Sequence, residues 1–288
     1  MKWLAVVNRA AGRAQEAEGL LEALERLPEL SAVAVYTDGP GSGTQIARDA
    51  AEFDGLIVVG GDGTISECLS GMDLPRQRLA IVPAGHGNCL GRDLGLCRPR
   101  DAIEALRRLQ CRPLDLMDVT VHADHASTTR RLCASTLAVG YVTDVVTVGR
   151  RRLPGLGHAA YAAAAVFTMP QEFRARHDGE DWAPFTGIVV NNTRHLANFD
   201  AFPQARLDDG LLDLMLQRCG WPRQQLHNCA VLAGSRAFGP LVMRQLPRAE
   251  FQLESPCTLM ADGELLSGVT RVSVESRPAA VSCVASAP

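Results

Sequence analysis

The stretch DGLIVVGGDGTISECLSG, residues 54–71, sets the expectation for the fold. Its apolar run Leu56–Val59 is typical of a buried strand, and the turn Gly60-Gly61-Asp62-Gly63-Thr64 follows directly. Glycines let a backbone approach an anion closely and adopt positive φ angles. A helix that begins after the turn would offer free N–H groups to a phosphate. The stretch therefore predicts a strand, a phosphate-binding turn and a helix.

Asp62 and Thr64 are the two side chains of this turn that can do chemistry. Thr64 is placed to cap the helix or to donate a hydrogen bond to a phosphate. A carboxylate beside a phosphate would repel it, so we expect Asp62 to hold Mg²⁺ or to accept a proton from a nucleophile. The alternative is a structural turn that Asp62 caps, because short glycine patterns are weak signals.

The first 118 residues alternate between strand and helix patterns. Strands are predicted over KWLAVV, AVAVYT, GLIVVG and LAIVPAG, and helices over AQEAEGLLEALERL, GTQIARDAAE, TISECLSGM and PRDAIEALRRL. Strands that are apolar on both faces, alternating with amphipathic helices, predict an α/β domain with a doubly wound parallel sheet. Binding sites in such sheets lie beyond the carboxyl ends of the strands.

After Met117 the predicted strands are separated mainly by turns. They cover DVTVHA, RRLCASTLAV, FTGIVVNN, LLDLMLQ, AEFQLES, TLMADG and RVSVES, with helical segments near residues 158–169 and 222–238. This pattern predicts a mostly antiparallel β-sandwich. We therefore expect a nucleotide-binding domain over residues 1–118 and a second domain over residues 119–288.

Composition excludes several classes of protein. The 288 residues are 47% hydrophobic and 21% charged, which is an ordinary globular balance. The net charge of −3 speaks against a nucleic-acid partner. The longest apolar stretch, His158–Met169, is too short to span a bilayer. Lys2 is the only lysine, so neither a P-loop nor a protein-kinase site can form.

The cysteine pattern indicates the compartment. Nine cysteines, an odd number, form no C-x-x-C pair, so reduced thiols in a cytoplasmic protein are expected. His122 and His125 have ligand-like spacing, but a polar hairpin turn explains them better than zinc does. The sequence leaves the oligomeric state open, a homodimer included.

A second glycine-rich turn supports nucleotide binding. The stretch VPAGHGNCLGRDLG, residues 82–95, follows the fourth predicted strand and contains Gly85, His86, Gly87 and Asn88. Two such turns at adjacent strand ends suit one nucleoside triphosphate. A third turn near the N-terminus contains Asn8 and Gly12. Arg92 is a candidate phosphate partner or, equally, a solvated surface arginine.

At this point the chain resembles a known family. Gly60–Thr64 with Glu67 and Gly71 is similar to the G-G-D-G-T-x-x-E-x-x-x-G signature of diacylglycerol-kinase-type lipid kinases, which include bacterial lipid kinases, sphingosine kinases and ceramide kinases. Four later segments resemble family segments in the same order: LDLMDV; VGYVTDVV, similar to a G-F-G-A-D strand; FPQARLDDGLLDLML; and MADGE.

The resemblance implies an ATP- and Mg²⁺-dependent kinase that phosphorylates a lipid hydroxyl in a cleft between two domains. By the same resemblance, Gly60, Gly61, Gly63, Thr64 and Glu67 belong to the nucleotide site, with Asn8 and Gly85–Asn88 beside them. The resemblance also gives Asp209 to structural Mg²⁺, Asp62 to the metal or the catalytic base, and Asp262 and Glu264 to activation of the acceptor hydroxyl.

Departures from the family pattern keep other functions open. Arg9 stands where the family has proline, and His86 and Cys89 replace the usual hydroxyl residue and acid of the second loop. The alternatives are a NAD kinase-like phosphotransferase, which shares the G-G-D-G-T loop, and a regulatory protein that binds nucleotide without turnover. A missing N-x-G-x-x-G-F-L run argues against the first, and the intact D-G-E against the second.

A lipid substrate would require peripheral contact with a membrane, at the inner face for a cytoplasmic protein. Residues 148–169 join Arg150–Arg152 to an apolar helical segment with Leu153, Tyr161 and Phe167. Arginines attract anionic lipids, and apolar residues beside them enter the interface. The alternative is a helix packed in the second domain beside a solvated basic loop.

Overall fold

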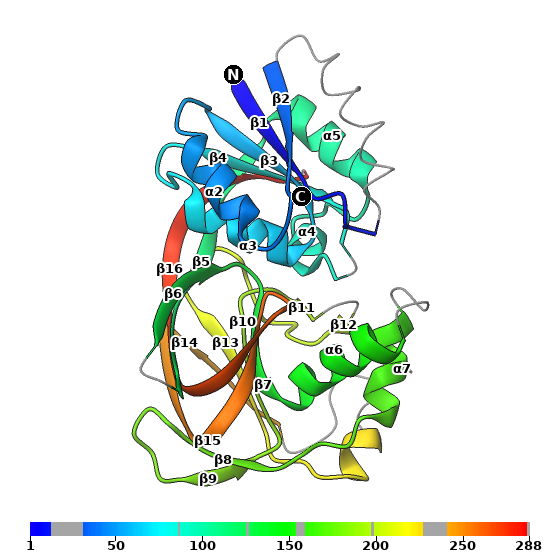
Figure 1. Cartoon of the computed structure of the whole chain (residues 1–288), viewed down its shortest axis with the longest axis vertical. Coiled ribbons are helices and arrows are strands. Elements are labelled where there is room, and N and C mark those ends of the chain that lie inside the picture. The colour runs from blue at the N-terminus through cyan, green and yellow to red at the C-terminus, as the bar shows by residue number, and fades with distance from the viewer. Residues whose placement is uncertain are drawn as a thin grey trace. The chain divides into compact units, whose positions relative to one another are not determined.

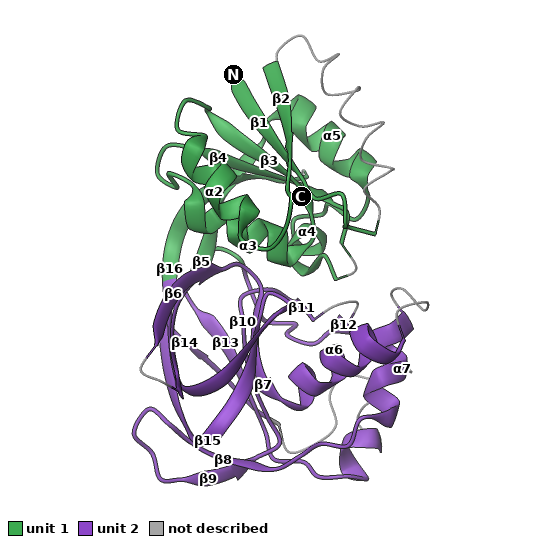
Figure 2. Ribbon diagram, viewed as in Figure 1, with its two compact units in different colours: residues 1–116, 207–210, 277–288 green, residues 117–206, 211–276 purple. Residues whose placement is uncertain are grey.

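The computed structural model describes residues 1–12, 31–85, 87–124, 127–153, 159–196, 199–226 and 241–286. They form two compact units (Figure 2). Unit 1 comprises residues 1–116, 207–210 and 277–288, and unit 2 comprises residues 117–206 and 211–276. The first division thus lies at 116/117 where we expected 118/119. Segments 207–210 and 277–288, which the sequence pattern assigned to the second domain, belong to unit 1.

Unit 1 is built on a parallel sheet (Figure 1). The strands pair in the order β2–β1–β3–β4, with bounds β1 (Lys2–Val7), β2 (Ser31–Tyr36), β3 (Gly55–Gly60) and β4 (Arg78–Pro83). Every residue of β3 is buried, because both faces of a parallel sheet are covered. The end of β16 (Glu264–Val284) adds a further parallel strand, with Ser282 and Cys283 opposite Arg78 and Leu79.

Four described helices belong to unit 1: α2 (Ser42–Asp49), α3 (Asp62–Gly71), α4 (Cys89–Asp93) and α5 (Pro99–Arg108). The connections through α2 and α3 cross the sheet in the same direction, so right-handed crossovers place both helices on one face. They touch at Gly71, where an added Cβ would lie 2.3 Å from the Thr44 carbonyl oxygen. The helix expected over residues 14–27 lies outside the described residues.

Unit 2 is an antiparallel, strand-rich region, so the predicted α/β fold class with a second antiparallel part is confirmed. Strands β5 and β16 each contribute residues to both units. The core buries apolar side chains such as Val119, Leu214 and Phe251. The remaining strands are β5 (Cys111–Ala123), β6 (Thr128–Cys133), β7 (Thr136–Gly140), β8 (Phe173–His177), β9 (Ala183–Phe185), β10 (Gly187–Asn191), β11 (His195–Leu196), β12 (Phe199–Asp200), β13 (Leu212–Gln217), β14 (Leu241–Leu246) and β15 (Arg248–Ala261).

A helical hairpin in unit 2 differs from the expectation. The stretch VGYVTDVV, compared above with a strand, leaves β7 at Gly140 and continues as α6 (Tyr141–Arg152). Gly140 has φ 80°, which ends the strand, and Tyr141 and Val145 then share one helical face. That face packs on Ala164 of α7 (Ala159–Phe167). The helix expected near 222–238 lies mostly outside the described residues.

Candidate active site

Three loops leave the sheet of unit 1 at the same level. Val7 of β1 lies opposite Val59 of β3, and Gly60 of β3 lies opposite Pro83 of β4. The residues that follow these strands therefore meet at one edge of the sheet. This edge is the place where parallel α/β sheets bind their ligands.

Asn8 joins the first loop to the glycine-rich turn. Its Nδ2 donates to Thr64 Oγ1 over 2.9 Å, and its backbone N–H donates to the Val59 carbonyl oxygen. Its Oδ1 accepts from the backbone N–H of Ala10. The structure thus brings together two of the residues that the sequence predicts beside a nucleotide.

The two glycine-rich turns touch through bare backbone. An added Cβ on Gly85 would lie 2.5 Å from Gly61 Cα, and one on Gly60 would lie 2.8 Å from Thr64 Cβ. Gly61 precedes the first turn of the ten-residue helix α3, where Gly63 and Thr64 lie. Close packing of the two turns therefore requires glycine at Gly85, and the fold of the first turn requires it at Gly60, whether or not a phosphate binds there. The same backbone presents the N-terminus of α3 at this edge.

Asp62 bridges the two turns. Its Oδ2 accepts from the backbone N–H of Cys89 at 3.2 Å and its Oδ1 from that of Leu90 at 3.3 Å. Gly87 lies against the same carboxylate, since an added Cβ would be 3.1 Å from Asp62 Oδ2. Asp62 therefore does cap a helix, as the structural alternative expected. The capped N-terminus belongs to α4 and not to α3.

Asn88 shapes the second turn from within. Its backbone is left-handed, with φ 49°, and its side chain makes two hydrogen bonds to Gly85. The Gly85 N–H donates to Asn88 Oδ1 at 3.0 Å, and Asn88 Nδ2 donates to the Gly85 carbonyl oxygen at 2.7 Å. Asn88 thus ties itself to Gly85 at the other end of the second turn. His86 lies outside the described residues.

Glu67 has a structural partner in α2. One carboxylate oxygen accepts from the backbone N–H of Gly41 and the other from that of Gly43, each at 3.0 Å. A carboxylate at a helix N-terminus is stabilising, because it satisfies free N–H groups and faces the positive end of the helix dipole. Position 67 is therefore explained by helix capping, and its contact with nucleotide stays a prediction.

Cys68, next along α3, offers no reactive thiol. Burial, reinforced by the Glu67 charge, raises the pKa of the Cys68 thiol to about 12. The thiolate is therefore scarce at neutral pH. The cysteines of the described residues form no disulfide.

Asp209, expected at a structural Mg²⁺ site, lies in the segment 207–210 that returns to unit 1. Within the described ranges, no three His, Cys, Asp or Glu side chains gather in a metal-binding group. Mg²⁺ commonly takes only one or two carboxylates and completes its shell with water and phosphate. Asp209 as a metal ligand therefore stays a prediction.

Asp115 is a buried carboxylate whose role the sequence did not reveal. Its two oxygens accept from the backbone N–H groups of Gly210 and Ala279, each at 2.6 Å. It thus fastens both returning segments of unit 1 to β5. The only available signal was an acid within the otherwise apolar run of LDLM.

In unit 2, Asp262 is buried, and both of its carboxylate oxygens accept hydrogen bonds. Its carboxylate accepts from the backbone N–H groups of Ala134, Ser135 and Thr136 and from the Ser135 hydroxyl, at 2.7–3.0 Å. Its own backbone is left-handed, with φ 46°. This arrangement fixes the turn between β15 and β16. The role of Asp262 as a base stays a prediction, and the geometry favours an anchor.

Glu264 is the more accessible member of the late acidic pair. Its side chain is 48% exposed and forms an ion pair with Arg131 of β6. The neighbouring Gly263 carbonyl oxygen accepts a hydrogen bond from Arg150 of α6. Two arginines therefore hold this turn. Both arginines lie more than 100 residues from this turn along the chain. Nothing in the sequence therefore links Arg131 or Arg150 to the turn.

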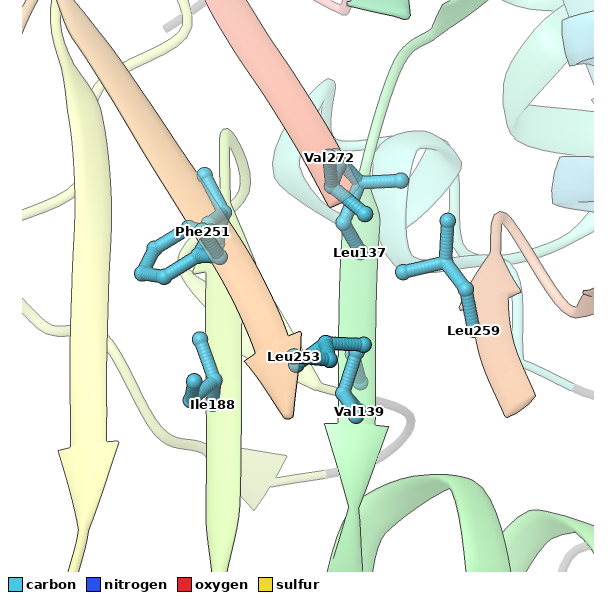
Figure 3. A pocket seen from close by; sticks show the side chains of 9 residues that line it. Leu137, Val139, Ile188, Phe251, Leu253, Leu259 and Val272 are labelled. Atoms are coloured by element: carbon cyan, nitrogen blue, oxygen red, sulfur yellow. The ribbon is translucent and has the colours of Figure 1, made fainter. Parts of the chain in front are cut away.

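An apolar pocket lies in the core of unit 2 (Figure 3). All of its lining side chains are hydrophobic and buried, and they come from β7, β10, β15 and β16. The cavity among them has a volume of about 10 Å³, roughly the room that one water molecule takes, so it is a small gap in the core and too small for a hydrocarbon chain. The lining residues are Leu137, Ala138, Val139, Ile188, Val190, Phe251, Leu253, Leu259 and Val272.

Comparison with known proteins decides the family. Residues 2–119 match the model of the diacylglycerol kinase catalytic domain. The "Probable lipid kinase YegS-like" protein of Chromohalobacter salexigens is 30% identical over 274 residues, which cover 90% of this chain and 82% of that protein. The chain belongs to the diacylglycerol kinase-type lipid kinases. The resemblance drawn from the sequence is thus confirmed.

Solved structures agree with the fold of this lipid kinase family member. A diacylglycerol kinase from Bacillus anthracis is similar with a TM-score of 0.69 and 19% identity, over 99% of this chain and 96% of the other. Yeast NADH kinase in complex with NADH is more distant, with a TM-score of 0.55 and 11% identity over 100% and 84%. At these identities the likeness concerns the fold alone. No helix within the described ranges has the length and apolar character to cross a bilayer.

Proposed function

We propose that this protein transfers the γ-phosphate of ATP to a hydroxyl of a lipid, such as diacylglycerol or a sphingoid-type lipid. The observation that carries the proposal is the meeting of three loops at one sheet edge, in a chain of the lipid kinase family. Because the loops meet through glycine backbone, polyphosphate oxygens can approach N–H groups there without side chains in the way.

Unit 1 supplies the proposed nucleotide site. The N-terminus of α3, with Gly60–Thr64, would bind phosphate, while Asn8 and Asn88 hold the flanking loops in place. Asp62 and Asp209 are the residues that would hold Mg²⁺, which supplies neutralisation of phosphate charge when bound. Glycine backbone and carboxylate oxygens are donors and ligands of the right chemistry for both groups.

Unit 2 supplies the proposed acceptor site. Phosphoryl transfer needs positioning and charge stabilisation more than covalent help, and a base that accepts the hydroxyl proton. Of the late acidic pair, Glu264 is the exposed member and pairs with Arg131, while Asp262 holds the turn that carries it. A cytoplasmic location, with contact at the inner membrane face, is part of this proposal.

The experiment that tests this proposal follows transfer of the labelled γ-phosphate from ATP to a lipid. The protein is incubated with γ-labelled ATP, Mg²⁺ and a mixed lipid extract, and labelled products are separated and identified. We expect label in a phospholipid, and none when Mg²⁺ is removed by a chelator. ATP binding without any labelled lipid would favour the regulatory alternative.

The second candidate is NAD phosphorylation, because the fold is also shared with yeast NADH kinase. The same labelled ATP with NAD as the acceptor tests it. Labelled NADP would show that the acceptor is a dinucleotide and would contradict the lipid proposal.

A further inference from the structure

Four large apolar side chains are exposed together at one place in unit 2. Phe167, Met169, Trp221 and Leu226 are 78%, 61%, 60% and 70% exposed. The first two lie at and just beyond the end of α7, and the other two lie in the segment after β13. We name these four residues the apolar cluster. Clustered exposed apolar residues mark an interaction site, whereas single ones need no explanation.

Hydrogen bonds hold the two halves of the apolar cluster together. Gln225 Nε2 donates to the Thr168 carbonyl oxygen at 3.0 Å, and Thr168 in turn bonds to Ala164 of α7. In Figure 1 the short yellow turn lies beside the end of α7, in agreement with this bond. Cys219 and Thr186 exchange two more hydrogen bonds at the start of the segment. The cluster is therefore presented on a fixed support.

The elements around the apolar cluster carry positive charge. Residues 141–153, 159–172 and 218–226 contain five arginines and two carboxylates, a net charge of +3, whereas the whole chain has −3. Of the two carboxylates, Asp144 is half-buried and Glu172 is exposed. The five arginines are Arg150, Arg151, Arg152, Arg218 and Arg223.

Four of these arginines have no carboxylate partner in the part of the chain that the structure describes. Within the described residues, Arg151, Arg152, Arg218 and Arg223 are exposed and take part in no ion pair. Surface arginines elsewhere, such as Arg108, Arg130 and Arg244, do pair with carboxylates. Arg218 lies over the Phe185 ring, so Arg151, Arg152 and Arg223 are the arginines that remain available to a partner. Exposed arginines and an apolar cluster complement a surface that is anionic and has an apolar interior.

The arginines and the apolar cluster do not form one continuous stripe. Tyr141 of α6 bonds to Ala165, and Gly149 packs on Tyr161, so α6 and α7 run antiparallel. Arg151 and Arg152 therefore lie near the start of α7, roughly 12 Å along the helix from its end. Arg223 is the basic residue beside Trp221 in sequence. Arg150 is engaged with Gly263 and is left out of the surface.

We propose that the apolar cluster enters the interface of an anionic lipid bilayer, while Arg151, Arg152 and Arg223 contact its headgroups. The choice of a bilayer rests on the proposed lipid substrate, together with the positive charge of the surrounding elements. Tryptophan and phenylalanine suit the boundary between headgroups and acyl chains. Arginines add attraction that weakens with salt.

The first experiment measures binding of the full chain to vesicles of phosphatidylglycerol and phosphatidylcholine, by cosedimentation. Replacing Phe167, Trp221 and Leu226 together by alanine is expected to weaken partitioning by at least about 10-fold. The matched control is Val33→Thr with Val242→Thr, which changes exposed apolar residues elsewhere and should leave partitioning unchanged. Undiminished binding by the triple variant would overturn the proposal, as would the absence of binding by the wild type.

The second experiment tests the arginines. Replacing Arg151, Arg152 and Arg223 by glutamine should weaken binding about 10-fold at low salt and abolish most of its salt dependence. The control replaces Arg76, Arg107 and Arg108, which already pair with carboxylates. Equal losses in both sets would show a general charge effect and contradict the assigned surface.

Fluorescence gives a local readout. Trp3 is buried and Trp182 stacks with Arg176, so Trp221 is the tryptophan that a bilayer would move out of water. Vesicles should shift the emission to the blue in the wild type and not in Trp221→Phe, which should still bind. A shift that persists in Trp221→Phe would overturn the placement of Trp221 in the interface.

Two readouts distinguish membrane docking by the apolar cluster from phosphorylation of a lipid. Phosphorylation of a short-chain soluble lipid should be unchanged in the triple alanine variant, so vesicle binding without lipid phosphorylation would contradict only the proposed function. Sedimentation of the protein without vesicles checks the other occupant, a second copy of the chain. A wild-type dimer that becomes monomeric in the triple variant, with vesicle binding retained, would overturn the bilayer proposal.

Discussion

Asp62 has both a structural contact and a proposed chemical role. Its carboxylate joins the two glycine turns through the N–H groups of Cys89 and Leu90, and we propose that the same carboxylate also holds Mg²⁺ or accepts a proton. We expect Asp62→Asn to reduce phosphoryl transfer by at least about 10²-fold. Loss of one accepted hydrogen bond should lower the free energy of unfolding by about 1 kcal/mol. Steady-state kinetics and thermal unfolding measure the two effects.

The control for this substitution is Asp49→Asn. Asp49 is an exposed acid of α2 that accepts from Gln45, so both activity and stability should stay near wild type. If Asp62→Asn lost stability but kept near-normal turnover, Asp62 would be a structural bridge and nothing more.

Asp262 and Glu264 are two residues apart and should respond differently. Asp262→Asn removes a charged acceptor from four donors in a buried site, and we expect the free energy of unfolding to fall by about 2 kcal/mol or more. Glu264→Gln removes only an exposed ion pair, worth less than about 1 kcal/mol, yet should lower kcat strongly. Denaturant unfolding and initial rates on both variants would check this; a stable Asp262→Asn with reduced kcat would reverse the assignment.

At the scale of elements, a strand or helix is predictable where its hydrophobic period and the turn residues that flank it indicate the same element. The strands β1, β3 and β4 are short apolar runs that end in glycine-rich turns, and α5 has a regular amphipathic spacing. Helix α6 was not predicted, because valines favour a strand locally and the helix contains four of them: Val142, Val145, Val146 and Val148. Packing against α7 overrides that preference, and this contact is tertiary information that the local sequence does not hold.

The packing of α2 on α3 gives a test at the same scale. Gly71→Ala places a Cβ 2.3 Å from the Thr44 carbonyl oxygen and 2.8 Å from Ala47 Cβ, so the helices must separate. We expect a loss of about 1–3 kcal/mol in the free energy of unfolding. Gly39→Ala is the matched control, because nothing lies within 4 Å of an added Cβ there. Equal stability of the two variants by denaturant unfolding would contradict the close helix contact.

At the scale of the whole molecule, the chain returns to its starting unit, which the sequence did not reveal. A strand pattern shows that residues 271–276 are extended, but not that β16 continues to pair with β4. The meeting of Asn8 and Thr64, which are 56 residues apart, was predictable because both follow neighbouring parallel strands at the same sheet edge. Arg131 and Arg150 were not predictable at the acidic turn, because only folding brings them there.

Truncation after Ser276 tests this return. The change removes the strand that pairs with β4 and takes the Ala279 N–H away from the buried Asp115 carboxylate. An unpaired sheet edge and a lost charged hydrogen bond should together prevent stable folding of unit 1. Thermal unfolding followed by circular dichroism would show the loss, and truncation after Ser286 serves as the control. Wild-type stability of the shorter chain would contradict a structural role for residues 277–286.

The identity of the phosphate acceptor can be measured directly in one competition experiment. The full chain receives γ-labelled ATP and Mg²⁺ with a mixed lipid extract and NAD in the same reaction, and the label is followed into the organic and aqueous phases. We predict time-dependent label in an organic-phase phospholipid, and at least about 10²-fold less with Asp62→Asn. Label that appears in NADP, or in neither acceptor while ATP binds normally, would contradict the lipid kinase account.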